Sequence, residues 1–429
     1  MRGSLGEGRK RSVKAVAMFT AFCCSLATAL AAARDLTLAE AETLLARNNR
    51  EVQAARRGVE SADAQRLIAA ARPNATFSFN NSEINNSTGP GPYFQRRIDN
   101  VFRIDQPFER GDKRTLRLDA ASGLQRAARG DFLDTLRQGL AMVQSSYFDL
   151  KQAQEKADVL AENAQLFSGT LAAAERRLKA GDLAQADVAK VQVDYERAQN
   201  DARGAQAERV RAQLALAYLI GAENEADELR AADPGPAAQK VELAAIEQAI
   251  EARPDVVAAK ARVDAAEKLR DLARAQRTRD VTLGAQYERF PGQAPVNSVG
   301  FGVAFPLFTG NDFSGDIQKA EVDRYAAMDA LGRARAIAGN ELRRAAGDVA
   351  AAADRLERFD TSLLGAASRS AQASEFAFQR GAISVLEVLD ARRTLRAVRL
   401  EALAARTDYA KALAAWRAAQ ASSASLESR

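Results

Sequence analysis

The sequence has 429 residues, a length that fits two ordinary domains or one long repeated structure. It contains only 10 prolines and 6% aromatic residues, a composition that favours long helices. Its net charge of +5 lies almost entirely in residues 1–33, which carry +4 and leave 56 basic and 55 acidic residues beyond them. This balance excludes the strongly basic surface of a typical nucleic-acid-binding protein.

Residues 1–33 have the pattern of a secretion signal peptide. A basic stretch precedes an apolar run over 15–30, and small residues suitable for cleavage follow at Ala31 and Ala33. A retained membrane anchor is the alternative, but the run is too short to span a bilayer comfortably. The only cysteines, Cys23 and Cys24, lie in this segment, and Phe22 before them argues against a lipid anchor.

The chain beyond residue 33 has neither Cys nor His. This absence excludes thiol catalysis, His-based acid–base catalysis and Cys/His metal sites. No Gly-x-x-x-x-Gly-Lys-Ser/Thr loop for nucleotide phosphates occurs either. We therefore expect a protein without enzymatic activity, cofactor or resident metal.

The prolines divide the chain, since none lies between 107 and 234 and none after 306. Proline breaks helix interiors, so two stretches of more than about 100 residues are free to be helical almost throughout. The first would run as one helix from about 111 to 178, roughly 100 Å long. An ordinary coiled coil would share this pattern.

The chain is an internal duplication. Three segments recur in the same order at nearly one offset: 181–188 matches 381–388, 106–111 matches 305–310, and 52–59 matches 256–263. Each half reads as a helix, two short strands, a very long helix, a glycine turn and another long helix. We expect a first repeat over 34–232, a linker over 233–240, a second repeat over 241–420 and a flexible tail over 421–429.

Four strands are predicted, at about 74–80, 98–106, 281–288 and 299–305. In each, apolar residues alternate with polar or small ones, as in a β-barrel that faces lipid on its outside. A half-buried sheet of a soluble protein is the alternative. In the barrel interpretation the membrane-facing residues are Phe77, Phe79, Phe102, Leu283, Tyr287, Phe301 and Phe305.

Four strands are too few to close a barrel, and an open edge in lipid leaves backbone groups unpaired. One chain must then recruit copies of itself, and three copies give twelve strands. A homotrimer is therefore our hypothesis.

The duplication, the strand pairs and the helical hairpins resemble the TolC family of outer-membrane factors over nearly all of the chain beyond residue 33. The most specific match is Phe378–Ala391, where the family reads Tyr-x-x-Gly, a spacer and Asp-Val-Leu-Asp-Ala. The resemblance implies a mainly α fold with a small β part: a trimeric outer-membrane β-barrel, four strands per chain, continued by a long periplasmic α-helical barrel. It also implies that Glu387 and Asp390 line the pore aperture, with Asp187 at the corresponding position of the first repeat. Two departures are Phe378 in place of tyrosine and Ile383 in place of a frequent arginine.

The resemblance further implies a passive duct in the outer membrane, with most of the chain in the periplasm. A periplasmic adaptor protein and an inner-membrane RND-type pump would be its partners. The adaptor would contact the glycine turns, at positions Gly181, Leu183, Gly381, Ile383 and Ser384. A soluble periplasmic coiled-coil adaptor is the competing class, but it should lack the duplicated strand pairs.

The stretch Pro107–Arg114 resembles a segment of the family's heavy-metal-cation branch. A structural interpretation is also open: Gly111 ends the strand, Asp112 caps the next helix, and Lys113 and Arg114 lie near the membrane surface. The exported solute is accordingly a heavy-metal cation in one interpretation and a drug or general solute in the other.

Overall fold

The computed structural model describes residues 34–82, 90–92, 98–239, 246–290, 296–380 and 382–427. The expected signal peptide 1–33 and the turn residue Gly381 lie outside these residues. The chain divides into two compact units, which are described separately. Unit 1 comprises Met1–Glu42, Ser146–Pro236 and Ala366–Thr407, and unit 2 comprises Thr43–Ser145, Ala237–Gly365 and Asp408–Arg429.

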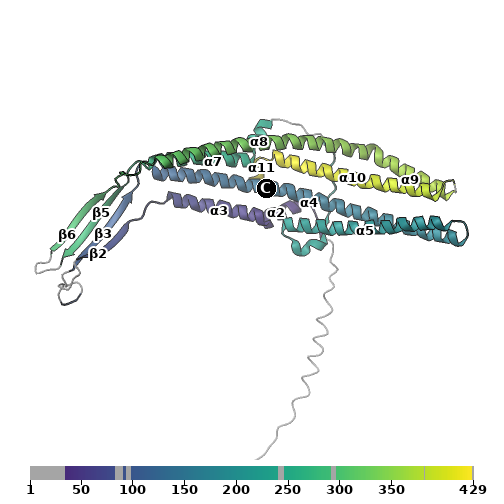
Figure 1. Cartoon of the computed structure of the whole chain (residues 1–429), viewed down its shortest axis with the longest axis horizontal. Helices are drawn as coiled ribbons and strands as arrows, with labels where there is room; N and C mark the ends of the chain where they lie inside the picture. The colour runs from purple at the N-terminus through teal and green to yellow at the C-terminus, as the bar shows by residue number, and fades with distance from the viewer. Residues whose placement is uncertain are drawn as a thin grey trace, which may run out of the picture. The chain divides into compact units, whose positions relative to one another are not determined.

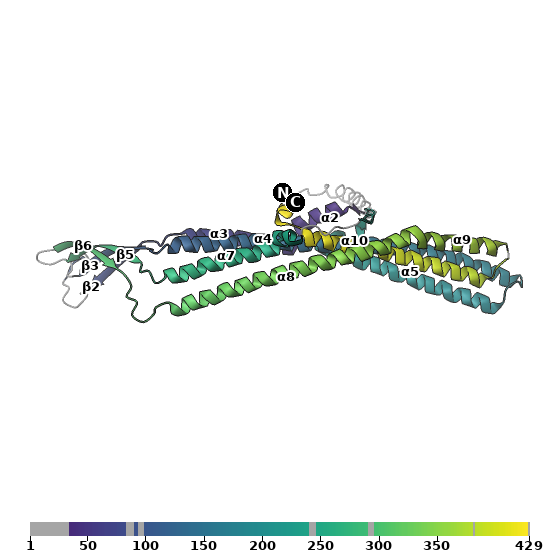
Figure 2. The same cartoon turned by 90° about the horizontal axis from the view of Figure 1, so that it is seen from above.

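The order of elements repeats, as the sequence predicts. The first half contains α2 (Leu38–Asn48), α3 (Arg50–Ala70), β2 (Thr76–Ser82), β3 (Asp99–Phe108), α4 (Lys113–Lys179) and α5 (Gln185–Ile220). The second contains α6 (Ile246–Ala252), α7 (Pro254–Ala275), β5 (Val281–Phe290), β6 (Val296–Ala304), α8 (Ser314–Arg358), the π turn η3 (Phe359–Leu363), α9 (Leu364–Gln379) and α10 (Val385–Gln420). Figure 1 and Figure 2 show this succession, and α5 and α10 differ by 200 residues at both ends.

Unit 2 contains one antiparallel sheet in the order β2-β3-β5-β6. Each half supplies one hairpin, and the pairing of β3 with β5 joins them. Because β2 and β6 each have a single neighbour among the described residues, both edges of the sheet are open in that part of the chain.

Unit 2 also contains helices α3, α7 and α8 and the first part of α4 (Figure 1). Helix α4 approaches α7 closely because it carries glycine at the contact: a Cβ atom at Gly130 would lie 2.8 Å from that of Ala258. Farther along, Leu342 and Val349 of α8 pack with Tyr409 and Trp416 of α10 in a buried cluster. Helix burial against neighbours, rather than intrinsic propensity, stabilises such long helices.

Unit 1 contains the end of α4, α5, α9 and most of α10, packed as two helical hairpins. A short parallel pair that the sequence did not predict lies beside them: β1 (Arg34–Leu36) with β4 (Leu229–Ala231), the latter preceded by the short helix η2 (Glu223–Glu228). The hydroxyl of Tyr147 donates a hydrogen bond to the Leu36 carbonyl at 2.9 Å and accepts one from the Asp233 N–H at 3.0 Å. Tyr147 thereby links the carboxyl ends of both strands to α4.

Two expectations need correction. The fourth strand ends at Ala304, so Phe305 lies just outside it; pairing with β5 stops there because Pro306 lacks a backbone donor for a further rung. The chain after 420 is not a plain flexible tail over its described part: Ser423–Glu427 forms α11, and Leu426 is buried. Its apolar side chain anchors this end.

No helix among the described residues is both long enough and apolar enough to cross a membrane.

Candidate functional site

The sheet of unit 2 has one largely apolar face. Register places Phe79, Phe102, Tyr287 and Val299 in one row across the four strands. The next row on the same face contains Phe77, Ile104, Ala285 and Phe301. Phe301 is 86% exposed, and most of the large side chains of these rows are exposed as well. Contiguous exposed apolar surface of this kind marks a protein or lipid interface.

This apolar band has a clear end. Two residues beyond the Tyr287 row, the same face carries Asn81, Asn100, Arg289 and Asn297. In the other direction comes the row of Gln106, Leu283 and Val303, in which the amide of Gln106 donates to the Pro73 carbonyl, and the band ends at Phe108 and Val281. Six residue steps from Val281 to Tyr287 span roughly 20 Å along the strand. Transmembrane barrels present an apolar band about 25 Å tall, so this band has the same order of size but is somewhat shorter.

The second helical turn in unit 1 carries two of the predicted aperture residues. Ser384 precedes α10, and its hydroxyl accepts from the Glu387 N–H at 3.4 Å and donates to the Glu387 carboxylate at 3.1 Å. This is a form of capping box, which satisfies a free donor of the first turn. Glu387 is thus held locally, whereas Asp390 is exposed and makes no ion pair or hydrogen bond within the described chain.

The two repeats differ electrostatically at this place. Glu387 and Asp390 lie three residues apart on the exposed side of α10, above the buried Val388 and Leu389. Their counterparts on α5 are Asp187 and Lys190, which form an ion pair at 3.1 Å. The first repeat is therefore neutral at these positions, and the second carries two negative charges.

The first turn, between α4 and α5, ends α4 through a left-handed glycine. Gly181 has φ +83°, and the Asp182 N–H donates to the Arg177 carbonyl at 2.9 Å. This pattern is a Schellman motif, which favours glycine at that position. In the second turn the Ala382 N–H makes the corresponding bond to the Ala377 carbonyl at 2.9 Å.

The predicted adaptor contacts at these turns are only partly exposed. Leu183 is half-buried and packs against the core cluster that contains Phe167, Val191 and Leu389. An apolar side chain beside a turn gains more by joining this core than by facing solvent. Ile383 is also half-buried, whereas Gly181 and Ser384 are exposed.

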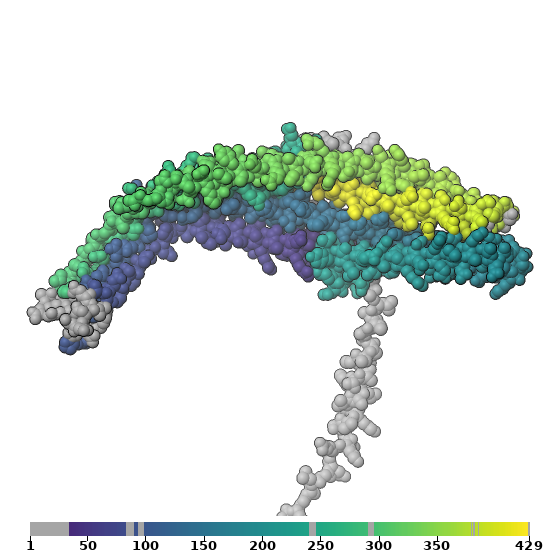
Figure 3. All heavy atoms as spheres, in the orientation of Figure 1, coloured from purple at the N-terminus to yellow at the C-terminus, as the bar shows by residue number. Residues whose placement is uncertain are grey.

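Sequence reasoning missed a row of arginines on α10. Arg392 donates to Glu375 of α9 at 2.5 Å and to the Thr170 hydroxyl of α4 at 3.0 Å. Arg393 pairs with Asp194 of α5 at 2.5 Å. Farther along, Arg396 pairs with Asp201 of α5 and Arg399 with Glu162 of α4. Figure 3 shows α10, in yellow, beside α9 and the teal helix α5 on one face of this unit.

The contacts of Arg392 border a cavity of about 420 Å³ between the helices of unit 1. Its wall is mostly apolar, with the Glu375–Arg392 pair at one side; it includes Leu166, Thr170, Leu183, Phe378 and Leu389. Phe378, which replaces the tyrosine of the related pattern, is thus a wall residue here. Near it, Arg392 makes the polar contacts between helices, to Glu375 of α9 and Thr170 of α4.

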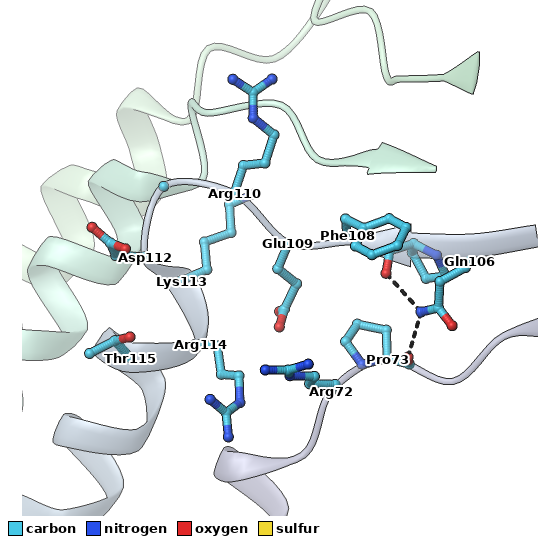
Figure 4. Close-up of a pocket in the computed structure, with 12 residues that line it drawn as sticks. Arg72, Pro73, Gln106, Phe108, Glu109, Arg110, Asp112, Lys113, Arg114 and Thr115 are labelled. Atoms are coloured by element: carbon cyan, nitrogen blue, oxygen red, sulfur yellow. Dashed lines mark hydrogen bonds between the residues drawn. The ribbon is translucent and has the colours of Figure 1, made fainter. Parts of the chain in front are cut away.

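The Pro107–Arg114 stretch lies where β3 leads into α4, around a hollow of about 860 Å³ (Figure 4). Glu109 accepts from Arg117 at 2.6 Å, and this hydrogen bond raises the pKa of Arg117. Arg114 donates to the carbonyl of Ala70 at 2.7 Å, and Arg117 to that of Ala69 at 3.0 Å. Both arginines therefore satisfy free carbonyls at the end of α3.

Lys113 has a structural role as well. Its side chain is only 5% exposed, and its ammonium lies 2.9 Å from the Asp280 carboxylate, which also accepts from the Arg110 N–H. Asp280 directly precedes β5, so this pair joins the two halves of the duplication at the base of the sheet. The side chain of Arg110 points away from Glu109 (Figure 4). No group of three or more acidic, Cys or His side chains suited to a metal occurs in the described part of the chain.

Comparisons with known proteins agree with this geometry. The family model described as "Outer membrane efflux protein" matches residues 28–222 and 245–421. The cobalt-zinc-cadmium resistance protein CzcC of Cupriavidus metallidurans is 26% identical over 378 residues, 87% of each chain.

Solved structures share the fold at low sequence identity. One is CusC, whose structures concern folding and transmembrane channel formation. Its TM-score is 0.74 at 18% identity, and the match covers 90% of this chain and 92% of the CusC chain. The outer-membrane channel OprN has a TM-score of 0.74 at 20% identity, covering 89% of each chain. The predicted TolC-like fold, mainly α with a small β part, is confirmed.

Proposed function

We propose, since this chain belongs to the outer membrane efflux protein family, that it is the exit duct of a tripartite efflux system. The family is one of outer-membrane channels with a helical part in the periplasm. The observation that carries the proposal is the sheet: one face is largely apolar and exposed, and both edges are open among the described residues. A duct conducts passively, so a periplasmic adaptor and an inner-membrane pump would supply opening and energy.

The open edges support a trimer. The unpaired backbone groups of β2 and β6 are unfavourable in lipid, and β6 of one copy can pair with β2 of the next. Three copies then make a closed barrel of twelve strands whose outer surface is the apolar face. Glutaraldehyde cross-linking and native mass measurement of the detergent-extracted protein test this. Three chains per particle are expected, and a folded monomer that conducts ions would contradict the trimer.

The acidic turn supports a cation-selective aperture. Three copies bring together six carboxylates from Glu387 and Asp390, and carboxylate rings favour cations. Because Ser384 holds Glu387, we expect Asp390→Asn to weaken cation preference more than Glu387→Gln in planar bilayers. Asp187→Asn combined with Lys190→Gln is the matched control, since it removes a balanced pair and leaves the net charge of that turn unchanged. Equal selectivity in all variants would contradict the aperture assignment.

Heavy-metal cations are the proposed solute. The similarity to CzcC over 87% of the chain supports this, as does the Pro107–Arg114 stretch as a resemblance. The side chains of that stretch serve the fold, and a duct conducts metals without ligating them. The test is deletion of the gene and growth on panels of metal salts and of drugs. Sensitivity confined to metals supports the metal branch, whereas sensitivity confined to drugs leaves a duct for drugs or general solutes.

The turns are the proposed adaptor contact. Gly181 and Ser384 are exposed beside Ala184 and Ala382, which offer small side chains for close packing of another helical turn. Gly181→Trp should therefore abolish adaptor capture, while Gly58→Trp, in the exposed middle of α3, should not. Retained capture by the Gly181 variant would place the adaptor elsewhere.

A further inference from the structure

The polar face of the sheet carries an ion pair that the aperture proposal does not use. Arg103 and Asp105 lie two residues apart on β3, on the face opposite to Phe102 and Ile104. The Arg103 Nε donates to Asp105 Oδ2 at 2.7 Å, and Nη2 donates to Oδ1 at 2.8 Å. The Arg103 Nη1 donates to the side chain of Gln286 on β5 at 3.2 Å. This bidentate geometry fixes the guanidinium in place.

Glycines on the neighbouring strands β5 and β6 leave space for this pair. Asp105 stands opposite Gly284, which stands opposite Gly302. A Cβ atom at Gly284 would lie 2.4 Å from Asp105 Oδ1 and 2.7 Å from Arg103 Nη2. A Cβ atom at Gly302 would touch the same Nη2 at 3.6 Å. The guanidinium therefore lies flat along the sheet over two glycines, and it does not project from it.

In the two rows that contain this ion pair, the positive charge of Arg103 is matched by the negative charge of Asp105. The rows that contain Arg103 and Asp105 are completed by Ser78, Thr76, Gln286 and glycines, none of which is charged. Glu288 is the next acidic residue, one row nearer the 290–296 connection, and it accepts from the Ser298 hydroxyl at 3.3 Å. Within these two rows Asp105 compensates Arg103, and Glu288 adds one negative charge per chain in the next row.

If the apolar face meets lipid, the polar face lines the lumen. We infer that Arg103 and Asp105, seated over Gly284 and Gly302, form a charge-balanced belt that keeps the membrane part of the duct free of a net positive field. This inference rests on the proposed function. A free ring of three guanidinium groups would repel cations, and Asp105 cancels that field while the glycines keep the lumen clear. The belt leaves cation preference to the separate acidic turn.

The test compares Asp105→Asn, Arg103→Gln and the double variant by reversal potential across planar bilayers in a salt gradient. Asp105→Asn exposes three positive charges per trimer, and Arg103→Gln exposes three negative ones. We expect opposite shifts of the cation-to-anion permeability ratio, each at least about twofold near 0.1 M salt, where the Debye length is about 10 Å. The double variant should return to the wild-type ratio.

A labelling experiment covers the case in which a charge variant does not fold. In a chain with Cys23 and Cys24 replaced by Ser, Gln286→Cys should react with positive and negative thiol reagents, which shift the ratio in opposite directions. Phe301→Cys on the apolar face should not react. Conducting channels whose ratio is unchanged by the single variants and by labelling overturn the belt alone. A wild-type protein that forms no channel overturns the proposed function and the belt together.

Discussion

Phe79 of β2 stacks on Phe102 of β3 with ring centroids 4.7 Å apart, and the ring of Tyr287 on β5 lies 6.3 Å from that of Phe102. These cross-strand pairs stabilise the sheet, yet they are on its exposed side. In water such an aromatic row would favour aggregation. The proposed lipid contact would cover this row.

Phe301→Arg tests whether the apolar face of the sheet meets lipid. At the middle of a bilayer an arginine on the lipid side costs about 2–4 kcal/mol. We expect that carbonate washing removes most of this variant from the membrane fraction and that few trimers form. Ser298→Arg, three residues earlier on the opposite face, is the control and should assemble normally. Equal assembly of the two variants would show that the apolar face does not meet lipid.

Arg393→Met tests the arginine row of α10. Its partner Asp194 is only 10% exposed and would remain buried without a counter-charge, so we expect a loss of about 3 kcal/mol at most in the free energy of unfolding. Arg396→Met is the control, because its partner Asp201 is 49% exposed and water replaces the lost pair. Urea titration followed by circular dichroism measures both. A larger loss for Arg396→Met would contradict the role of burial.

Tyr147→Phe removes the link between α4 and the Asp233 N–H. We expect faster hydrogen exchange in β1 and β4 and a loss of about 1–2 kcal/mol. Burial raises the pKa of Tyr147 from its ordinary 10 to about 12. The folded state thus favours the neutral phenol, so its contribution is full below about pH 10 and falls as the pH rises toward 12. The exchange rates of wild type and Phe variant should converge over that range; a constant difference would contradict this.

Gly111→Ala tests the turn between β3 and α4. Gly111 has φ +72°, and a Cβ atom there would lie 2.8 Å from the Thr278 hydroxyl oxygen. The backbone conformation and the contact both oppose a side chain, so we expect a loss of at least about 1 kcal/mol. Gly58→Ala is the control in the exposed part of α3, where alanine should stabilise by about 0.5–1 kcal/mol. Thermal melts of both variants measure the difference. An unchanged stability of Gly111→Ala would contradict the proposed need for glycine in this turn.

Much of the fold follows from local patterns in the sequence. The absence of proline located α4 and α5, and the offset near 200 residues located their copies. Period-two alternation located the strands within a few residues, because most residues of one face are apolar. The limits of β6 were less certain, since alternating Gly300 and Gly302 carry no side chain to mark a face.

The contacts of the candidate site were less predictable. Arg393 and Asp194 are 199 residues apart in sequence, and many arginines of α10 could have faced solvent instead. The strands β1 and β4 have three residues each, too few for a period to appear. Glu387 and Asp390 were found through a resemblance, and the capping contact of Glu387 depends on a side-chain rotamer that the sequence does not specify.

The most direct measurement is the single-channel current of the purified protein in a planar lipid bilayer. The account predicts discrete, long-lived conductance steps from trimeric particles, with a preference for cations that Asp390→Asn weakens. Folded, trimeric protein that produces no steps at any concentration would contradict it.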